Sequence, residues 1–266
     1  MATDQKLFLD KRQSDIMRVV QEKGSCSIGD LALALDVTTE TIRRNLKPLV
    51  NEGVITKFHG GVMLPERVAE PPFQSRMQLN RAAKMRIGNR VAAQIKDGDS
   101  LMIDTGSTTA CVAHALSVRS NLLVVTNSIE IARHLVTRDG NRVFLAGGEL
   151  RSDDAAAFGS SALGFVRQFK AKVAILSIGG INDRGELTDF HMAEAEFSRA
   201  LMEQAEQVWV LADQSKFGRE APMKVGNLKD VDVLFTDRSP PQSLVELCKN
   251  AGVRIDIAEI AEAPGV

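Results

Sequence analysis

The feature that most constrains the fold of this chain is an alternation of short apolar runs with helical segments. Apolar runs linked by crossover helices are typical of an open, mostly parallel sheet that is buried on both faces. We therefore expect an α/β domain from about residue 76 onward. The predicted strands are Leu101–Ile103, Leu122–Val125, Val143–Leu145, Val173–Leu176, Val208–Leu211, Val231–Phe235 and Val253–Ile257. The predicted helices between them are Thr109–Leu116, Ile129–Val136, Ser161–Phe169, Ala193–Ala205 and Ser243–Ala251.

The first 64 residues show a different pattern, with three short amphipathic helices separated by tight turns. Asp10 and Gln13 are spaced as a capping box for the first helix, and Gly24 follows its end. Apolar side chains then recur at helical spacing in each segment. They are Ile16, Val19 and Val20 in the first, Ile28, Leu31, Ala32 and Leu35 in the second, and Ile42, Leu46, Leu49 and Val50 in the third.

The second and third of these helices are joined closely enough to form a helix-turn-helix. Ser27 is predicted to cap the second helix, and Thr38 or Thr39 to cap the third. In this motif the later helix enters the major groove of DNA, so its outward side chains are the candidates for contact. They are Thr39, Glu40, Thr41, Arg43, Arg44 and Lys47. A solvated helix face beside a small core is the alternative interpretation of the same residues.

A predicted hairpin follows the third helix and completes the order of a winged helix-turn-helix. Its strands are Val54–Phe58 and Val62–Leu64, separated by a glycine-bearing turn. Lys57 and His59 are placed where they can reach the sugar-phosphate backbone. Residues 1–64 hold nine Lys and Arg against eight Asp and Glu. DNA binding would therefore depend on where the cations lie and not on a general positive field.

A proline-rich stretch marks the predicted domain boundary. Residues 65–75 contain three of the eight prolines in the chain and have no apolar periodicity. We expect a DNA-binding domain at 1–64, a linker at 65–75 and an effector-binding and oligomerisation domain at 76–266. The last of these begins with a helix that continues to about Ile95.

Polar and glycine residues follow five of the predicted strands, where open parallel sheets bind their ligands. The turn Gly106–Thr109 suits an anion, because glycine permits close approach and the first N–H groups of the next helix are free. Lys216 adds a cation, and four carboxylates add acceptors for hydroxyl groups, which together fit a phosphorylated sugar or polyol. Helix capping and ordinary surface roles are the alternatives. The predicted ligand-binding residues are Asp104, Gly106, Ser107, Thr108, Thr109, Thr126, Asn127, Gly148, Gly180, Asp189, Glu194, Asp213 and Lys216.

Composition argues against several other classes of protein. The net charge is -1, so the chain as a whole has no basic field for nucleic acid or anionic membranes. Three distant cysteines and four histidines without ligand spacing predict no disulfide framework, no metal site and no cofactor. No apolar run approaches the ~20 residues of a membrane-spanning helix, and the start lacks the apolar core of a signal peptide. We expect a cytoplasmic protein.

The order of motifs resembles the DeoR family of bacterial transcription regulators over nearly the whole chain. The N-terminal likeness lies in Thr38–Leu46 and Ile55–Gly61. The C-terminal likeness lies in five motifs, namely Ile103–Thr109, Val125–Asn127, Leu145–Arg151, Ile178–Ile181 and Asp213–Gly218. The effector domain of this family is similar in fold to ribose-5-phosphate isomerase, and Asp213 to Lys216 also resembles a segment of that enzyme.

This sequence departs from the family pattern at three places. Asn45 stands where the family usually has Asp, and Ser198 stands where members commonly have Lys, so a ligand contact made by that lysine does not transfer. Pro48 lies inside the third helix, where it removes a hydrogen bond and clashes with the preceding turn. We therefore expect that helix to kink or end early at Pro48.

The resemblance implies a transcription regulator, most simply a repressor of carbohydrate or polyol genes that leaves its operator when a phosphorylated sugar or polyol binds. The motifs around Leu145–Arg151 and Asp213–Gly218 are close to those of glycerol-3-phosphate-responsive members, which ranks that effector first. A homo-oligomer, dimer or tetramer, is expected because symmetric assemblies read paired half-sites. Two alternatives stay open. One is an isomerase-like enzyme with Asp189 or Glu194 as its base, and the other is a DNA-binding oligomer without a small effector.

Overall fold

A computed structural model of the protein describes residues 11–23, 25–51, 55–58, 61–63 and 70–258. The chain divides into two compact units, one to Arg67 and one from Val68 onward, and each is treated by itself. The division falls inside the predicted linker. Among the described residues, none of the helices combines the length and the apolar character needed to cross a membrane.

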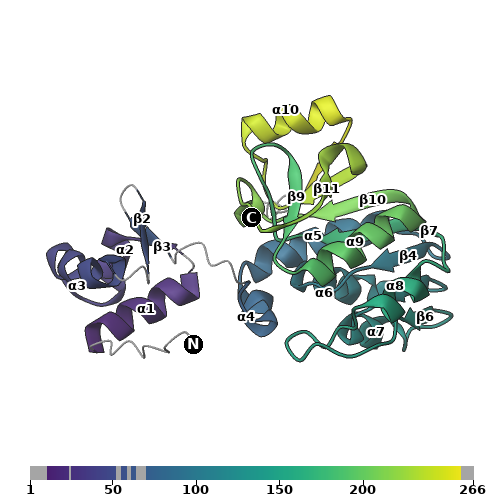
Figure 1. Ribbon diagram of the computed structural model, residues 1–266, viewed down its shortest axis with the longest axis horizontal. Helices are drawn as coiled ribbons and strands as arrows, with labels where there is room; N and C mark the ends of the chain where they lie inside the picture. Colours follow the sequence, from purple (N-terminus) through teal and green to yellow (C-terminus); the bar gives the residue numbers. More distant parts are fainter. Residues whose placement is uncertain (1–10, 24, 52–54, 59–60, 64–69, 259–266) are drawn as a thin grey trace, which may run out of the picture. The chain divides into compact units, whose positions relative to one another are not determined.

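The first unit has the predicted winged helix-turn-helix fold (Figure 1). Its apolar core contains the predicted inward residues of all three helices, with Ile16, Leu31, Ile42 and Leu46 fully buried. The hairpin is antiparallel, and an additional strand that the sequence pattern did not reveal joins it in the order β1-β3-β2. The elements are α1 (Lys11–Lys23), β1 (Ser25–Ser27), α2 (Ile28–Ala34), α3 (Thr39–Asn51), β2 (Thr56–Phe58) and β3 (Gly61–Met63).

Both predicted caps are present, since Ser27 Oγ accepts from the N–H of Asp30 at 3.0 Å and Thr38 Oγ1 from that of Thr41 at 3.2 Å. Of the two outcomes expected at Pro48, an early end is wrong, because α3 continues through Pro48 to Asn51, and a kink stays a prediction. Burial of Leu49 beyond the proline, at 1% exposure, stabilises the last turn against the lost hydrogen bond. Asp10, Gly24 and His59 lie outside the described residues.

The second unit is built on a seven-stranded parallel sheet, and all seven predicted strands are confirmed. The strand order is β13-β12-β10-β7-β4-β5-β6, so the chain crosses from one half of the sheet to the other at β7. Every neighbouring pair is parallel. The strands are β4 (Ser100–Ile103), β5 (Leu123–Thr126), β6 (Arg142–Leu145), β7 (Ala171–Ser177), β10 (Ala205–Leu211), β12 (Val233–Thr236) and β13 (Arg254–Ile257).

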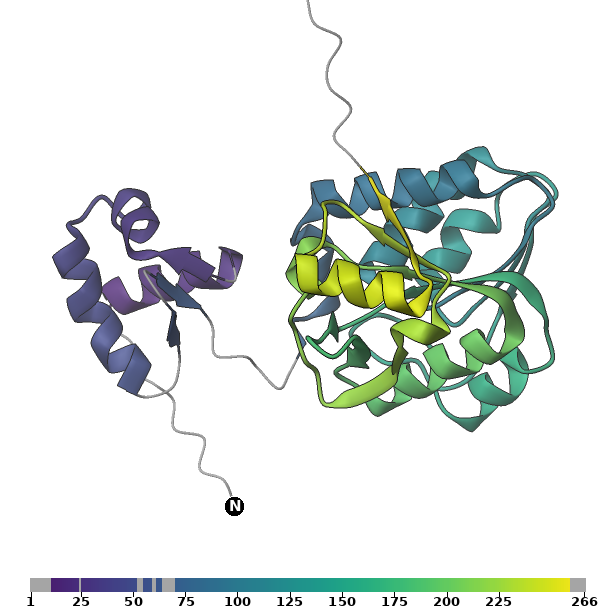
Figure 2. The same cartoon turned by 90° about the horizontal axis from the view of Figure 1, so that it is seen from above.

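Helices cover both faces of this sheet (Figures 1 and 2). One apolar cluster joins the sheet to α5, α6 and α7, and another joins it to α8, α9 and α10. The first helix, α4, begins at Phe73, before the predicted end of the linker. The helices are α4 (Phe73–Gln78), α5 (Arg81–Gln94), α6 (Ser107–Ala115), α7 (Ile129–Leu135), α8 (Ser160–Val166), α9 (Met192–Gln204) and α10 (Gln242–Ala251), with short 3-10 turns η1 (Leu116–Val118), η2 (Gln214–Lys216) and η3 (Leu228–Asp230).

A small antiparallel sheet in the order β11-β9-β8 was not predicted. Its strands are β8 (Gly180–Ile181), β9 (Glu186–Asp189) and β11 (Met223–Asn227). The first strand of this sheet, β8, comes soon after the end of β7, and the strand β9 ends at Asp189. It therefore places that carboxylate beside the carboxyl ends of the parallel strands.

Candidate functional site

The head of α6 is the centre of the candidate ligand site. This helix begins at Ser107, directly after β4 and the turn at Asp104–Gly106, and its first N–H groups have no partner within the helix. Lys84 from α5 reaches this point, where its Nζ donates to Ser107 Oγ at 2.9 Å and to the carbonyl oxygen of Arg76 at 2.6 Å. Lys84 is 4% exposed. A buried cation thus lies beside the positive end of a helix, which is an arrangement that attracts anions.

Two lysines of this region are easier to deprotonate than ordinary lysines. Burial lowers the pKa of Lys84 to about 8, although the carboxylate of Asp213 opposes the shift. Burial likewise lowers the pKa of Lys216 on η2, against the raising effect of Glu70. Because an anionic ligand would restore the preference for the charged form, both lysines are suited to respond to one.

A glycine and a carboxylate join the head of α6 to the neighbouring strand β7. A Cβ atom at Gly106 would lie 1.9 Å from Ser177 Oγ, so any other residue there would force the Ser177 side chain to shift. The N–H of Ser177 donates to both oxygens of Asp104, at 3.0 and 3.1 Å, and the Ser198 hydroxyl donates at 3.4 Å. Burial raises the pKa of Asp104 well above its usual range, and the nearby carboxylates of Asp189 and Glu194 raise it further.

Arg151 forms the opposite side of the site. One of its guanidinium nitrogens lies 2.5 Å from Glu194 Oε1, it pairs with Asp154, and it stacks 4.6 Å from the centre of the Phe158 ring. Burial raises the pKa of Glu194 while Arg151 lowers it, and the raising effect is the larger. Burial also raises the pKa of Asp189, with repulsion from Glu194 adding to it.

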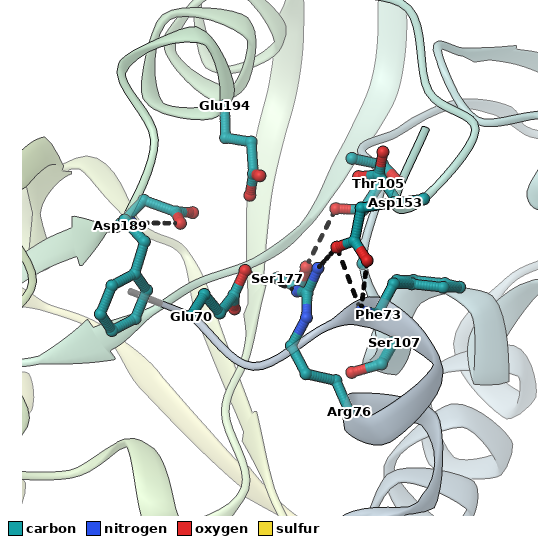
Figure 3. A network of polar contacts seen from close by, with 12 residues as sticks. Glu70, Phe73, Arg76, Thr105, Ser107, Asp153, Ser177, Asp189 and Glu194 are labelled. Carbon is teal, nitrogen blue, oxygen red and sulfur yellow. Dashed lines mark hydrogen bonds and ion pairs between the residues drawn. The ribbon is translucent and has the colours of Figure 1, made fainter. Parts of the chain in front are cut away.

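Glu70 and Arg76 lie between these two sides (Figure 3). Arg76 Nη1 is 2.9 Å from Glu70 Oε2, and Arg76 Nη2 is 3.9 Å from Asp153. Asp153 also accepts from the N–H of Phe73 through both of its oxygens, at 3.0 and 3.1 Å. Figure 3 shows the carboxyl groups of Glu70, Asp189 and Glu194 converging on one space.

Several predicted ligand-binding residues have internal hydrogen-bonding or packing roles. Thr109 Oγ1 donates to the carbonyl of Gly106 at 3.1 Å, and Thr126 Oγ1 accepts from the N–H of Ser128 at 3.2 Å. A Cβ at Gly180 would lie 2.4 Å from the Arg219 carbonyl oxygen, so this glycine allows two backbones to approach. Gly148 is exposed on the loop after β6, and Thr108 is buried on α6.

Two buried acceptors of the predicted set have unused hydrogen-bonding capacity. Asn127 donates to the carbonyl of Ala157 at 2.9 Å, while its Oδ1 has no hydrogen-bond partner within the described parts of the chain. Asp213 accepts from Asn80 and Ser215 through Oδ1, and its Oδ2 is likewise unpartnered among these residues. Both side chains are at most 1% exposed. Buried acceptors of this kind are rare unless a ligand or water uses them.

Lys84, Arg151, Glu70 and Arg76 are charged residues of the site that the sequence prediction did not include. Lys84 carried a usable signal, because it lies three and seven residues before the buried Ile87 and Val91 and so interrupts the apolar face of its helix. Arg151 ends the family-like motif Leu145–Arg151 but was not among the predicted ligand-binding residues. Glu70 and Arg76 had no local signal, since they fall in or beside the predicted linker.

A possible metal-ligating group also escaped the sequence interpretation, which expected no metal site. Glu70, His191 and Glu194 each offer a ligand atom, and these atoms lie within 4.8 Å of one another. Both carboxylates of this group already form ion pairs, Glu70 with Arg76 and Glu194 with Arg151. A cation would have to compete with both guanidinium groups.

Six of the eight predicted DNA-contacting residues belong to α3. Arg44 and Lys47 are exposed, and Thr39 begins the helix. Arg43 and Glu40 are also exposed, and Arg43 Nη1 lies 3.9 Å from Glu40 Oε2, so the charge of Arg43 is partly paired. Thr41 is half-buried, and its hydroxyl shares a 3.0 Å hydrogen bond with that of Thr38. Lys57 is exposed on β2, and His59 lies outside the described residues.

Comparisons with known proteins identify both units. Residues 12–68 match the DeoR-like helix-turn-helix domain, and residues 79–238 match the DeoR C terminal sensor domain. The chain is 36% identical over 247 residues to the glycerol-3-phosphate regulon repressor of Escherichia coli (strain K12), with 93% of this chain and 98% of that protein covered. It is 28% identical over 257 residues to the HTH-type transcriptional repressor GlcR of Bacillus subtilis (strain 168), covering 95% and 98%.

Among solved structures, ribose 5-phosphate isomerase A from Methanocaldococcus jannaschii aligns with 52% of this chain and 55% of its own, at 15% identity and a TM-score of 0.38. The two domain matches and the full-length relatives agree with the winged helix and the parallel sheet described above. The chain belongs to the DeoR family of transcription regulators.

Proposed function

We propose that this protein is a repressor of carbohydrate or polyol catabolic genes, and that a phosphorylated sugar or polyol releases it from its operator. The observation that carries the effector half is the contact of Lys84 Nζ with Ser107 Oγ at the head of α6. It places a buried cation beside free helix N–H groups, where a phosphate would be bound by both charge and hydrogen bonds.

Two further residues at the carboxyl ends of parallel strands favour a ligand that also carries hydroxyl groups: Asp213 follows β10, and Asn127 follows β5. Asn127 and Asp213 present buried oxygens without hydrogen-bond partners in the described structure, and a sugar or polyol hydroxyl would donate to them. Lys216 and Arg76 add positive charge near the same point. Because one relative with 36% identity is named for glycerol-3-phosphate, we rank that compound first among the candidate effectors.

The DNA half of the proposal rests on the exposed side chains of α3. Arg44 and Lys47 have no carboxylate within ion-pair distance among the described residues, so they are available to phosphates or base edges. Relatives over nearly the full chain are named as repressors. A homo-oligomer is part of the proposal, since paired half-sites require at least two DNA-binding units.

A panel of phosphorylated compounds tests the effector assignment. Thermal unfolding would be followed with glycerol-3-phosphate, ribose-5-phosphate, glucose-6-phosphate and inorganic phosphate, using unphosphorylated glycerol as the control. A ligand at 100 times its Kd should stabilise the unit that binds it by about 2.7 kcal/mol. Stabilisation by none of the phosphorylated compounds, or an unchanged operator affinity at saturating ligand, would refute the induction proposal.

An isomerase is the second candidate, because Asp189 and Glu194 are buried carboxyl groups with raised pKa values near the anion site. Such groups are candidates for general bases. Incubation with ribose-5-phosphate and detection of the ketose product distinguishes the two functions. We expect no turnover above that of a Glu194→Gln, Asp189→Asn double variant.

A further inference from the structure

Glu70 lies near the start of the second unit, within the predicted linker, and its side chain is buried in the candidate ligand site. The side chain is 5% exposed, and its Oε2 lies 2.9 Å from Arg76 Nη1. The two groups are not aligned as a hydrogen bond, since Oε2 of Glu70 and Nε of Arg76 have no hydrogen-bond partner among the described residues. The contact is therefore chiefly electrostatic.

The surroundings of Glu70 are divided between cations and like charges. Arg76 forms an ion pair with Glu70. Among the carboxylates near Lys216, Glu70 raises the pKa of that lysine the most. On the other side, Glu70 contributes to the raised pKa values of Asp189 and Glu194. A carboxylate between two other carboxylates stays there because the cations hold it. It would leave if a stronger anion took those cations.

The backbone after Glu70 is fixed by Asp153, a carboxylate that the same arginine also approaches. Pro71 and Pro72 follow, and then Phe73, whose N–H is held by Asp153. Arg76 also lies 3.9 Å from Asp153, so one guanidinium contacts the carboxylates at both ends of this segment. Release of residues 70–72 would free a segment of about 10 Å when extended.

We propose that Glu70 is a tethered anion that competes with the effector's phosphate for Arg76 and Lys216, so that effector binding frees the start of the sensor unit from its anchor. The inference rests on the proposed function and names its regulation. A phosphate carries about -1.5 to -2 charges against -1 for a carboxylate, and it also accepts from the N–H groups of α6. It should therefore displace Glu70 while using the same cations.

This competition defines two states of the effector-free protein. In one, Glu70 is seated and the protein is competent to bind operator. In the other, Glu70 is released and the cations are open to effector. The apparent effector affinity is the intrinsic affinity reduced by the fraction in the second state. A substitution that unseats Glu70 must therefore strengthen effector binding and weaken DNA binding together.

The test compares Glu70→Gln, which removes the charge and keeps the shape, with Glu196→Gln on the exposed face of α9 as a charge-matched control. The Kd of glycerol-3-phosphate and inorganic phosphate would be measured by calorimetry. The Kd of DNA would be measured with a fragment selected by the wild-type protein from a randomised pool. We expect about fivefold tighter effector binding and about fivefold weaker DNA binding for Glu70→Gln, with Glu196→Gln like the wild type. Glu70→Asp, which keeps the charge on a shorter side chain, should lie between.

The outcomes separate this inference from the function beneath it. If Glu70→Gln binds phosphate compounds equally or more weakly, or binds DNA as tightly as the wild type, the tethered-anion inference is wrong. A merely structural role for Glu70 would lower both affinities together with the thermal stability, which also overturns it. If the wild-type protein binds none of the phosphate compounds, the proposed effector class fails first.

Discussion

At the scale of single residues, the lysine at the head of α6 has the most informative environment. Lys84 is buried with a pKa of about 8, so near neutral pH it is mostly charged and above pH 8 it is mostly neutral. A phosphate ligand is fully dianionic well above its second pKa of about 6 and favours the charged lysine. Binding must therefore include proton uptake once the pH exceeds the pKa of Lys84 in the free protein.

We expect effector affinity to fall between pH 8 and pH 9.5, by up to about tenfold per pH unit, and to be nearly constant between pH 7 and pH 7.5. Calorimetry in buffers of different ionisation enthalpy measures the proton uptake directly. Lys84→Met should bind more weakly at pH 7 and lose most of the pH dependence, whereas Lys229→Met on the exposed turn η3 should keep both. A wild-type slope in Lys84→Met would assign the titration to another group.

The same residue shows how far the site could be predicted. The ends of β4 and β10 were predicted correctly, because in each case an apolar run is followed directly by polar residues. Lys84 interrupted an otherwise apolar helix face and could have been chosen on that ground. Glu70 and Arg76 could not, because their roles arise from contacts with Asp153, Asp189 and Lys216 that only the folded chain brings together.

At the scale of elements, α3 contains an exposed proline within its length. Pro48 has no N–H to donate, and its ring crowds the preceding turn, yet Leu49 beyond it is buried. Pro48 removes one hydrogen bond of the helix, so the last turn depends more on the packing of Leu49 than it would in a helix without a proline. This turn should be the part of α3 that opens most readily.

Replacing the proline tests that view. Pro48→Ala should stabilise the DNA-binding unit by about 1 to 3 kcal/mol, because alanine restores the hydrogen bond and removes the clash. Hydrogen exchange of the α3 amides in the full chain measures the gain. The neighbouring exposed substitution Lys47→Ala should change protection by less than about 0.5 kcal/mol. Equal or lower protection in Pro48→Ala would show that the helix is already strain-free.

Element prediction failed where strands were short and polar. The parallel strands were found because burial on both faces makes them continuous apolar runs. In contrast, β8 has two residues, and β9 and β11 contain charged or glycine residues within four or five positions. Their pairing is fixed by the antiparallel register of distant segments, which no local pattern records.

At the scale of the whole molecule, the two units are joined in one chain, and their ligands should influence each other through it. If effector lowers operator affinity, operator must lower effector affinity by the same factor, typically 5-fold to 150-fold. Titrating glycerol-3-phosphate with and without saturating selected DNA measures this reciprocity. Arg44→Ala should weaken DNA binding while leaving the effector Kd of the DNA-free protein unchanged. A changed effector Kd in that variant would contradict the separation of the two surfaces.

Any redesign of the sensor for a different inducer meets a constraint at Gly106. Because a methyl group there would collide with the Ser177 side chain, a residue larger than glycine at position 106 requires Ser177 to move or to be replaced by a smaller residue. Ser177 in turn holds Asp104 through its N–H. A library that diversifies position 106 should therefore vary position 177 with it, and under the proposed function Asn127 and Asp213, whose buried oxygens have no hydrogen-bond partner in the described structure, are the positions to vary for a new specificity.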